Sequence, residues 1–421
     1  MKKIGLKRIG LKRIGYDICE YILACCLIIN CRAIWLTIPG SGDKINSIVN
    51  LMIVFAVCGC VLLKGKYKIK NIKCGIKISI ALLLYLLFFI LVNGYNRKIF
   101  LVWMIICICL NIYIFVCNDK ENYPSIFEKY INIMVVIGII SIVIWLMGSV
   151  FHVISPNMAI STTWTSTGKP ITVPGYWGIQ FERQISDIFS FLGVSVRNSS
   201  FFAEAPMASF NFSIALLLEL LVIERKKHKY KIITLILAIL TTFASTGYLI
   251  VIGILGYGYF KYKPKKMGMK IIKIFIIPIV VGVVGTFIII LVLQKLGTSS
   301  GNIRVEDFVI GYNIWRKYAI WGCGYENNDL IKTYFSISRT NMGFSNSLTQ
   351  ILAQCGLYIF VLYIYCFMKG IIQEIKNKNV NMVVFIIVFF ALFAFTLVSY
   401  QYIVVVILLF MLSQKDYIKI K

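Results

Sequence analysis

The chain has 421 residues, of which 59% are hydrophobic and 14% are charged, and its mean hydropathy is +0.83. These values lie outside the range of soluble globular domains, so they exclude a water-soluble enzyme and indicate a polytopic membrane protein. The net charge of +27 would suit a nucleic-acid partner, but the positions of the basic residues indicate membrane topology instead.

In chain order, the sequence opens with KKIGLKRIGLKRIG, which predicts a basic cytoplasmic arm over residues 1–16, lying on anionic membrane lipids. A membrane-spanning helix needs about 20 apolar residues. Single spans are expected at 17–38, 44–63, 74–93, 99–117, 131–154, 207–223, 271–294 and 347–368. The apolar stretches 232–260 and 381–413 are too long for one crossing, so each is expected to form a hairpin, with turns near 245–247 and 399–401.

These elements predict an all-α polytopic membrane protein with about twelve transmembrane helices, built as a single integral membrane domain over residues 1–421. With both termini placed in the cytoplasm, the inner segments hold 30 of the 44 Lys and Arg residues. This is the positive-inside bias of membrane proteins. The charge therefore reflects orientation and attraction to anionic lipids, and no nucleic-acid partner is expected.

Two predicted extracytoplasmic loops, 155–206 and 295–345, are much longer than the other connections. Long loops in a compact protein are usually functional. No nucleotide is available on that side of the membrane, and no phosphate-binding loop of the GxxxxGKS kind occurs in the chain. A reaction at these loops must use a substrate that carries its own activation.

The cysteines and histidines do not form a pattern typical of a metal site or a disulfide framework. Twelve of the 13 cysteines fall in or beside predicted spans, and Cys323 alone lies in an outer loop. His152 and His228 are predicted on opposite sides of the membrane. No bound metal and no cofactor are expected.

The stretch SVRNSSFFAEAPMASF places two charged residues, Arg197 and Glu204, at the start of an apolar span. Pro206 suits the first turn of a helix, so Glu204 is expected at the helix N-terminus, where the helix dipole favours a carboxylate. The guanidinium of Arg197 matches phosphate oxygens. A structural ion pair between these two residues is the alternative interpretation. Asp17, Glu20 and Arg32, near the first span, are interpreted as interface anchors.

Four segments, taken in order, resemble the Wzy-type polysaccharide polymerases, which are relatives of the O-antigen ligases. VRNSSFFAEAPMASF is similar to their Arg-x-x-Ser-Phe-Phe-x-Glu-Pro element, and LTTFASTGYLIVIGIL to their Ser-Arg/Thr-Gly hairpin. IRVEDFVIGYNIWRKYAIWGCGYENN is similar to their Arg…Trp…Gly-x-Gly segment, and NSLTQILAQCGLYIF to their Asn-x-Leu…Gly-Leu element. The chain departs from the pattern at Ala205, Ala244 and Ser345; the ligases carry histidine at the last of these positions, so the polymerases are favoured.

The resemblance implies a fold similar to GT-C-type glycosyltransferases and polymerisation of polyprenyl-diphosphate-linked oligosaccharides. It implies that Arg197 and Arg304 bind the diphosphate and that Glu204 acts as general base or orients the acceptor hydroxyl. Further candidates for substrate binding are Arg183, Ser245, Gly324 and Asn346. A chain-length regulator and a flippase are the expected partners. An O-antigen-type ligase and a flippase of lipid-linked oligosaccharides are the alternative functions.

Overall fold

The computed structural model describes residues 2–65, 67–117, 123–165, 169–184, 196–223, 227–261, 282, 299–336, 339 and 343–414. Six helices in these ranges are long and apolar enough to cross a membrane. They are α2 (Gly42–Leu63), α3 (Ile69–Val92), α4 (Arg97–Cys117), α5 (Ile126–Trp145) with η2 (Leu146–Val150), α6 (Ala205–Leu217) with η4 (Leu218–Val222), and α13 (Ser347–Lys376). The described chain is therefore that of a helical membrane protein.

Six predicted single spans overlap these six helices, and both long apolar stretches form two helices joined by a turn. The first pair is α7 (Lys229–Thr241) and α8 (Ser245–Lys261), and the second is α14 (Val380–Phe395) and α15 (Tyr402–Ser413). The predicted span 271–294 lies outside the described residues, apart from Gly282. The total of twelve spans stays a prediction.

The first predicted span, 17–38, differs from the structure at both ends. Helix α1 runs from Lys2 to Asn30, so the predicted basic arm is continuous with the first apolar helix. The helix ends before Arg32, whose positive φ of 62° reverses the chain direction, and the short helix η1 (Ile34–Thr37) follows. The prediction that Arg32 lies within a span is wrong, because the chain has already left the helix there.

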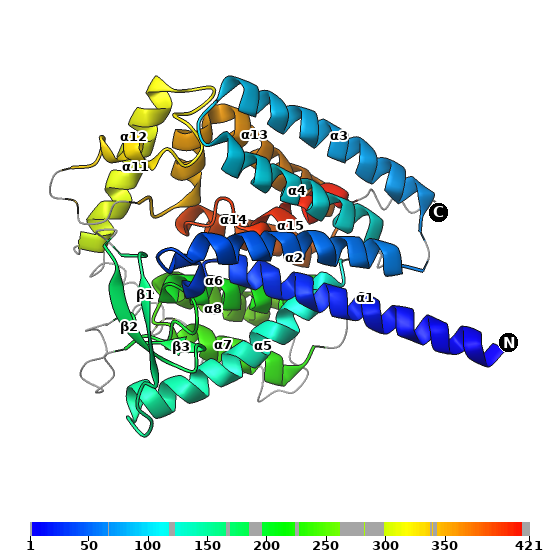
Figure 1. Cartoon of the computed structure of the whole chain (residues 1–421), viewed down its shortest axis with the longest axis horizontal. Helices are drawn as coiled ribbons and strands as arrows, with labels where there is room; N and C mark the ends of the chain where they lie inside the picture. The colour runs from blue at the N-terminus through cyan, green and yellow to red at the C-terminus, as the bar shows by residue number, and fades with distance from the viewer. Residues whose placement is uncertain are drawn as a thin grey trace.

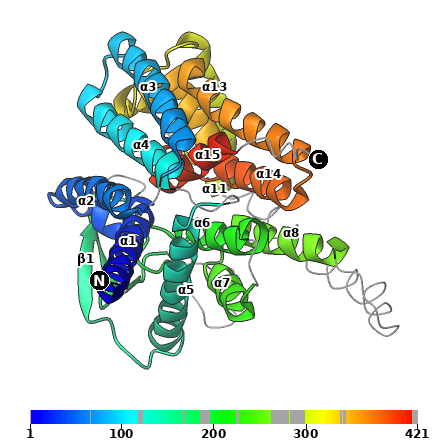
Figure 2. The ribbon, with the colours of Figure 1, turned by 90° about the vertical axis from the view of Figure 1, so that its right-hand side faces the viewer.

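The helices pack around α6, in which every residue except Pro206 is buried. Helix α6 contacts α5, α7, α8 and α14. Figure 2 shows α5–α8 on one side of the molecule and α3, α4, α13, α14 and α15 on the other. Figure 1 shows the strands and α11 at the end of the bundle opposite the start of α1; we call this the site end.

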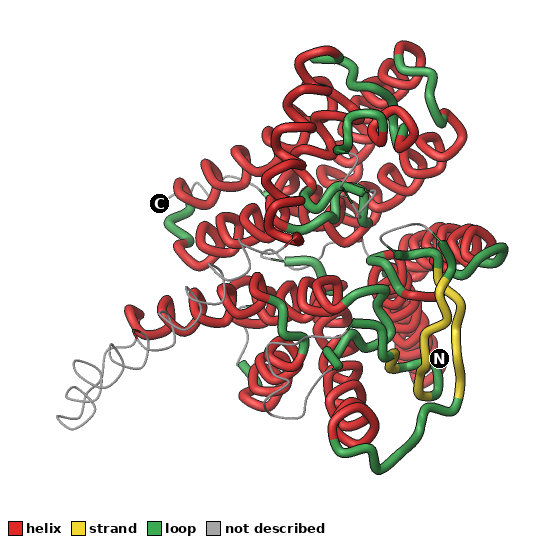
Figure 3. The backbone as a smooth tube through the Cα atoms, turned by 90° about the vertical axis from the view of Figure 1, so that its left-hand side faces the viewer, coloured by secondary structure: helices red, strands yellow, loops and turns green. Residues whose placement is uncertain are grey.

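The first long loop contains a small antiparallel sheet, so the prediction of an all-α protein is wrong for this region. Strand β1 (Met158–Thr162) pairs with β2 (Ile171–Tyr176), which pairs with β3 (Gln180–Phe181). Figure 3 shows these strands at the edge of the helical bundle. The Thr37 and Thr162 hydroxyls are 2.6 Å apart, which ties β1 to η1. Strands this short need such outside support.

The second long loop is largely helical, with α11 (Ser299–Lys317) and α12 (Asn328–Lys332). A buried ion pair of 2.6 Å joins Arg339 to Asp307 of α11. The backbone N–H of Ser345 donates to the other oxygen of Asp307 at 2.7 Å. These contacts hold α11 against the start of α13.

Helix α13 is interrupted at Gly356, where φ is 62°, and the segment after α11 fills the interruption. Backbone N–H groups of Cys323 and Gly324 donate to carbonyls at Ala353 and Gln354, while those of Leu357 and Tyr358 donate to Ala319 and Ile320. A Cβ at Gly356 would lie 2.4 Å from the Ile320 carbonyl oxygen. Glycine is therefore required where these two backbones meet.

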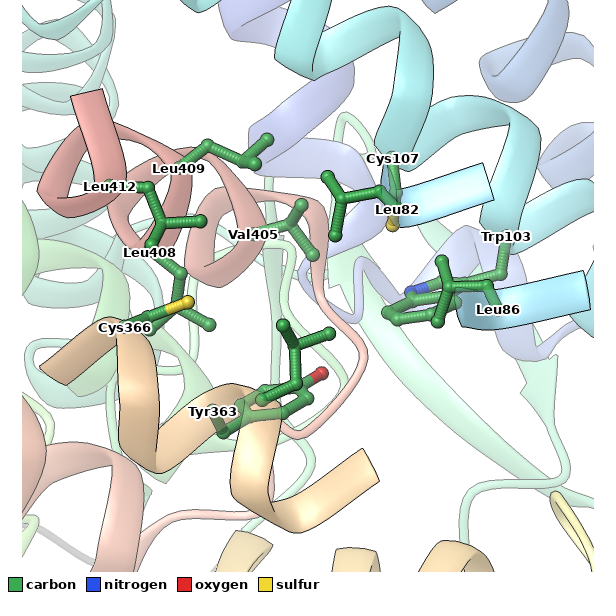
Figure 4. Close-up of a pocket in the computed structure, with 11 residues that line it drawn as sticks. Leu82, Leu86, Trp103, Cys107, Tyr363, Cys366, Val405, Leu408, Leu409 and Leu412 are labelled. Carbon is green, nitrogen blue, oxygen red and sulfur yellow. The ribbon is translucent and has the colours of Figure 1, made fainter. Parts of the chain in front are cut away.

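An apolar cavity of about 50 Å³ lies between α3, α4, α13 and α15 (Figure 4). Its lining includes Leu86, Trp103, Tyr363 and Leu408. The indole of Trp103 donates to the Tyr400 carbonyl at 3.1 Å, and the Tyr363 hydroxyl donates to the Ser399 carbonyl at 2.7 Å. The polar atoms of both rings therefore hydrogen-bond to backbone carbonyls of the α14–α15 turn, and the cavity wall stays apolar.

We expect Gly356→Ala to destabilise the protein by about 2–4 kcal/mol, because alanine disfavours positive φ and its Cβ would overlap backbone. Gly253→Ala in α8 is the matched control, since a Cβ at Gly253 would have no atom within 4 Å. Thermal unfolding of the purified protein in detergent measures the difference. Equal melting temperatures for the two variants would contradict the role assigned to Gly356.

Candidate functional site

Glu204 lies immediately before α6, in extended conformation with φ −157° and ψ 154°. Its backbone carbonyl accepts the N–H of Met207 at 3.0 Å, but its side chain makes no capping hydrogen bond. The carboxylate is 23% exposed. The carboxylate can therefore interact with other side chains or with a ligand, and the helix dipole favours its negative charge.

Among the described residues, Arg32 is the cation that forms an ion pair with Glu204, with Nη1 3.7 Å from Oε1. Backbone contacts between two distant segments bring the pair together. The N–H of Ile34 donates to the Phe201 carbonyl at 2.8 Å, and the N–H of Ala203 donates to the Arg32 carbonyl at 2.9 Å. The positive φ of Arg32 turns the chain so that this pairing is possible.

The structural ion pair considered for Arg197 and Glu204 is thus made by Arg32 instead. The Nε of Arg197 donates to the Thr242 carbonyl at 2.9 Å, at the α7–α8 turn. Its backbone N–H donates to Gln184 O at 2.9 Å. The side-chain carbonyl of Gln184 accepts the Ala205 N–H at 3.0 Å. Arg197 is therefore held beside the start of α6 by neutral groups, and its charge has no ion-pair partner at close range among the described residues.

Arg183 and Arg304, from two further segments, interact electrostatically with the same carboxylate. Nη1 of Arg183 donates to the carbonyl of Ala203, the residue before Glu204. Arg304 lies in α11, one turn before Asp307. Glu204 exerts an electrostatic attraction on both guanidinium groups. The structure therefore brings together all four charged residues predicted for the site and adds Arg32.

Burial is the main influence on these four guanidinium groups and lowers the pKa of each, while Glu204 opposes the lowering in every case. The pKa of Arg197 falls to about 10. Arginine does not lose its proton in proteins, so all four side chains are positive at neutral pH. We call Arg32, Arg183, Arg197, Arg304 and Glu204 the arginine cluster.

Several N–H groups of this cluster are buried without a hydrogen-bond partner within the described part of the chain. They are Nη1 of Arg32, Nε of Arg183 and Nη2 of Arg197. A buried donor without a hydrogen-bond partner on a charged group is costly, and a catalytic role or a bound water or ion are among the explanations for such groups. Their chemistry suits an oxyanion with several oxygens.

Glu326 is a second carboxylate near the cluster. It adopts a positive φ of 52° in the turn after α11, and the Asn96 side-chain amide donates to the Tyr325 carbonyl beside it at 3.1 Å. Burial raises the pKa of Glu326, and the positive charge of Arg32 opposes this. The ring of Trp164 covers Arg32, with the guanidinium carbon 4.4 Å from the ring centroid. Arg32 thus forms an ion pair with Glu204, interacts electrostatically with Glu326 and lies against an aromatic face.

The remaining predicted residues have structural contacts. Asn346 caps α13, its side-chain oxygen accepting the Thr349 N–H at 2.9 Å. Gly324 donates to the Gln354 carbonyl and packs closely on Tyr95. Ser245 is the first residue of α8, the helix whose Tyr248 interacts electrostatically with Arg197. Of these three, Ser245 and Gly324 belong to segments with a residue that interacts electrostatically with the cluster, Tyr248 and Glu326 respectively.

Arg32 and Glu326 are the site residues that the sequence alone does not select. The sequence places Arg32 within an apolar span, although a basic residue at the predicted outer end of that span runs against the positive-inside bias. Glu326 follows Gly-Cys-Gly-Tyr, a sequence typical of a tight turn. Both signals are visible in the sequence, but neither indicates that Arg32 interacts with both Glu204 and Glu326.

Among the described residues, no group of three or more His, Cys, Asp or Glu side chains is placed to hold a metal ion. Comparison of the chain with protein-family models, characterised proteins and solved structures finds no match. The functional interpretation therefore rests on the geometry and electrostatics of the arginine cluster.

We expect Glu204→Gln to lower stability by about 1–3 kcal/mol, because it leaves buried guanidinium groups without their shared carboxylate. This expected loss of stability is smaller than that for a fully buried ion pair, because the Glu204 side chain is partly exposed. Asp329→Asn is the control, because Asp329 pairs with Lys332 at the exposed surface. The melting temperature in detergent should fall for Glu204→Gln and not for Asp329→Asn. An unchanged melting temperature of Glu204→Gln would contradict the electrostatic interaction of Glu204 with the buried arginines.

Proposed function

We propose that this chain is a polysaccharide polymerase of the bacterial cytoplasmic membrane, with both termini in the cytoplasm and the arginine cluster at the outer face. It joins polyprenyl-diphosphate-linked oligosaccharide repeat units by glycosyl transfer. The supporting observation is the convergence of four arginines on one carboxylate, with buried N–H donors left over.

Charge favours a diphosphate as the ligand. The four arginines, together with Glu204 and Glu326, leave two positive charges uncompensated within this group of residues. A diphosphate esterified at both ends carries two negative charges, and each guanidinium can donate to two of its oxygens. Neutralising the cluster with such a ligand removes the cost of burying the excess charge.

In the proposed reaction, a hydroxyl of the incoming repeat unit attacks the anomeric carbon at the end of the growing chain. The new carbon–oxygen bond forms as the bond between the anomeric carbon and the diphosphate oxygen breaks. The electron pair leaves with polyprenyl diphosphate, whose additional negative charge the arginines stabilise. Glu204 orients the hydroxyl or takes its proton.

Aromatic side chains around the cluster support binding of sugar rings. Trp35 stacks on Phe201, with ring centroids 5.0 Å apart, and Phe201 stacks on Phe202. Phe201 and Phe202 are buried, so the aromatic faces beside the charged groups are those of the partly exposed Trp35 and of Trp164 over Arg32. A chain-length regulator and a flippase are the proposed partners of such an enzyme.

The test is the length distribution of lipid-linked and surface glycan in the native host. We compare wild type with a deletion, Glu204→Gln, Arg197→Ala, Arg304→Ala and Arg32→Gln. Loss of transition-state charge stabilisation by one arginine costs about 100-fold or more in rate. We therefore expect single repeat units in place of the ladder of longer chains, while Asp329→Asn keeps the ladder. Membrane insertion is checked for every variant.

Other patterns would contradict the proposal. Long lipid-linked chains that fail to reach their final acceptor in the deletion strain would identify a ligase. Single units that accumulate only at the inner leaflet would identify a flippase. A normal ladder in both Glu204→Gln and Arg197→Ala would refute the site assignment.

A further inference from the structure

An exposed apolar surface at the site end continues the lipid-facing side of α5. Along this helix, exposed apolar residues recur every three or four positions, at Val136, Ile140, Val143 and Met147. This spacing keeps them on one helix face. Helix α5 with η2 is long and apolar enough to cross a membrane, so this face lies against lipid.

The apolar surface does not end with the helix. Phe151, four residues after Met147, is 68% exposed, and Val153 is 67% exposed. Trp177, at the turn between β2 and β3, is 58% exposed, and Met158, at the start of β1, is also exposed. We call these four residues, Phe151, Val153, Met158 and Trp177, the hairpin patch. Large exposed apolar patches on a folded surface usually mark an interaction.

Hydrogen bonds fix the hairpin patch to the end of α5. Ser149 of η2 and Tyr176 of β2 both donate to the same Glu182 oxygen, at 2.8 and 2.7 Å. The N–H of Trp177 donates to the Asn157 side chain at 2.9 Å. A Cβ on Gly148 would overlap the Tyr176 ring, so strand and helix end are in close contact. The patch is therefore a rigid extension of the α5 surface.

The local charge also suits a lipid surface. Between Lys129 and Phe181 the chain contains no Asp or Glu, and the carboxylate that follows, Glu182, accepts hydrogen bonds from Ser149 and Tyr176. Acidic side chains near the headgroups would be repelled by anionic lipids. Tryptophan is the residue most typical of the boundary between apolar lipid and water.

We propose that the hairpin patch inserts into the headgroup region of the membrane leaflet at the site end, and so anchors the β1–β2 hairpin to the lipid surface. Trp164, two residues after β1, covers Arg32. The hairpin runs from the patch, at the start of β1, to Trp164 beyond the other end of that strand, so the anchor fixes the element that carries this wall of the arginine cluster. This inference rests on exposure, spacing and hydrogen bonds, and it is independent of the proposed enzymatic activity.

The test uses tryptophan fluorescence in phosphatidylcholine vesicles, with or without bromine on the acyl chains near the headgroups. Because the chain has seven tryptophans, the contribution of Trp177 is the difference between wild type and Trp177→Phe. We expect brominated lipid to reduce this contribution by about two-fold or more, as for an interfacial tryptophan, and iodide in the buffer to leave it nearly unchanged.

Thr172→Trp in the Trp177→Phe background is the control, because Thr172 is exposed on β2 away from the turn. Its emission should respond to iodide and not to brominated lipid. Trp177 emission that responds to iodide alone would place the patch in water and overturn the proposal. Shielding from both quenchers would also overturn it, since another protein surface would then cover the patch.

Discussion

The structure depends on one electrostatic constraint: a single carboxylate, Glu204, serves four arginines that come from four separate parts of the chain. Burying four guanidinium groups close together is unfavourable unless negative charge and hydrogen bonds compensate. Glu204 supplies part of this compensation from the N-terminus of α6, the central helix. The α1–η1 turn, the segment before α6 and α11 must all meet at this point for the arginines to share this carboxylate.

Backbone contacts make that meeting possible. Pairing of residues 32–34 with 201–203 fixes Arg32 to the start of α6. The insertion of residues 319–324 into the break of α13, together with the Asp307–Arg339 pair, fixes α11 to the same end. These contacts depend on glycine and on residues with left-handed backbone conformations. Such conformations are unfavourable in ordinary helices and persist where the surrounding structure fixes them. The site end is accordingly rigid, while its charge remains incompletely compensated within the described chain.

Hydropathy is sufficient to predict most of the helices, because apolar length is a local property of the sequence. The position of Glu204 at the start of α6 is also predictable, since Pro206 marks a helix start. The contact of Arg32 with Glu204 is not, because it depends on backbone pairing between residues far apart in the chain. The small sheet escapes prediction for a similar reason: β1 and β2 are stabilised by η1 and η2 and not by their own length.

The central claim is that the arginine cluster binds a lipid-linked diphosphate, and the most direct measurement is the shift in melting temperature of the purified protein with polyprenyl diphosphate. Polyprenyl monophosphate of the same chain length controls for the lipid. We expect the diphosphate to stabilise the wild type more than the monophosphate, and Arg32→Gln to remove most of that difference. Equal stabilisation by the two lipids, or a difference that persists in Arg32→Gln, would contradict the account.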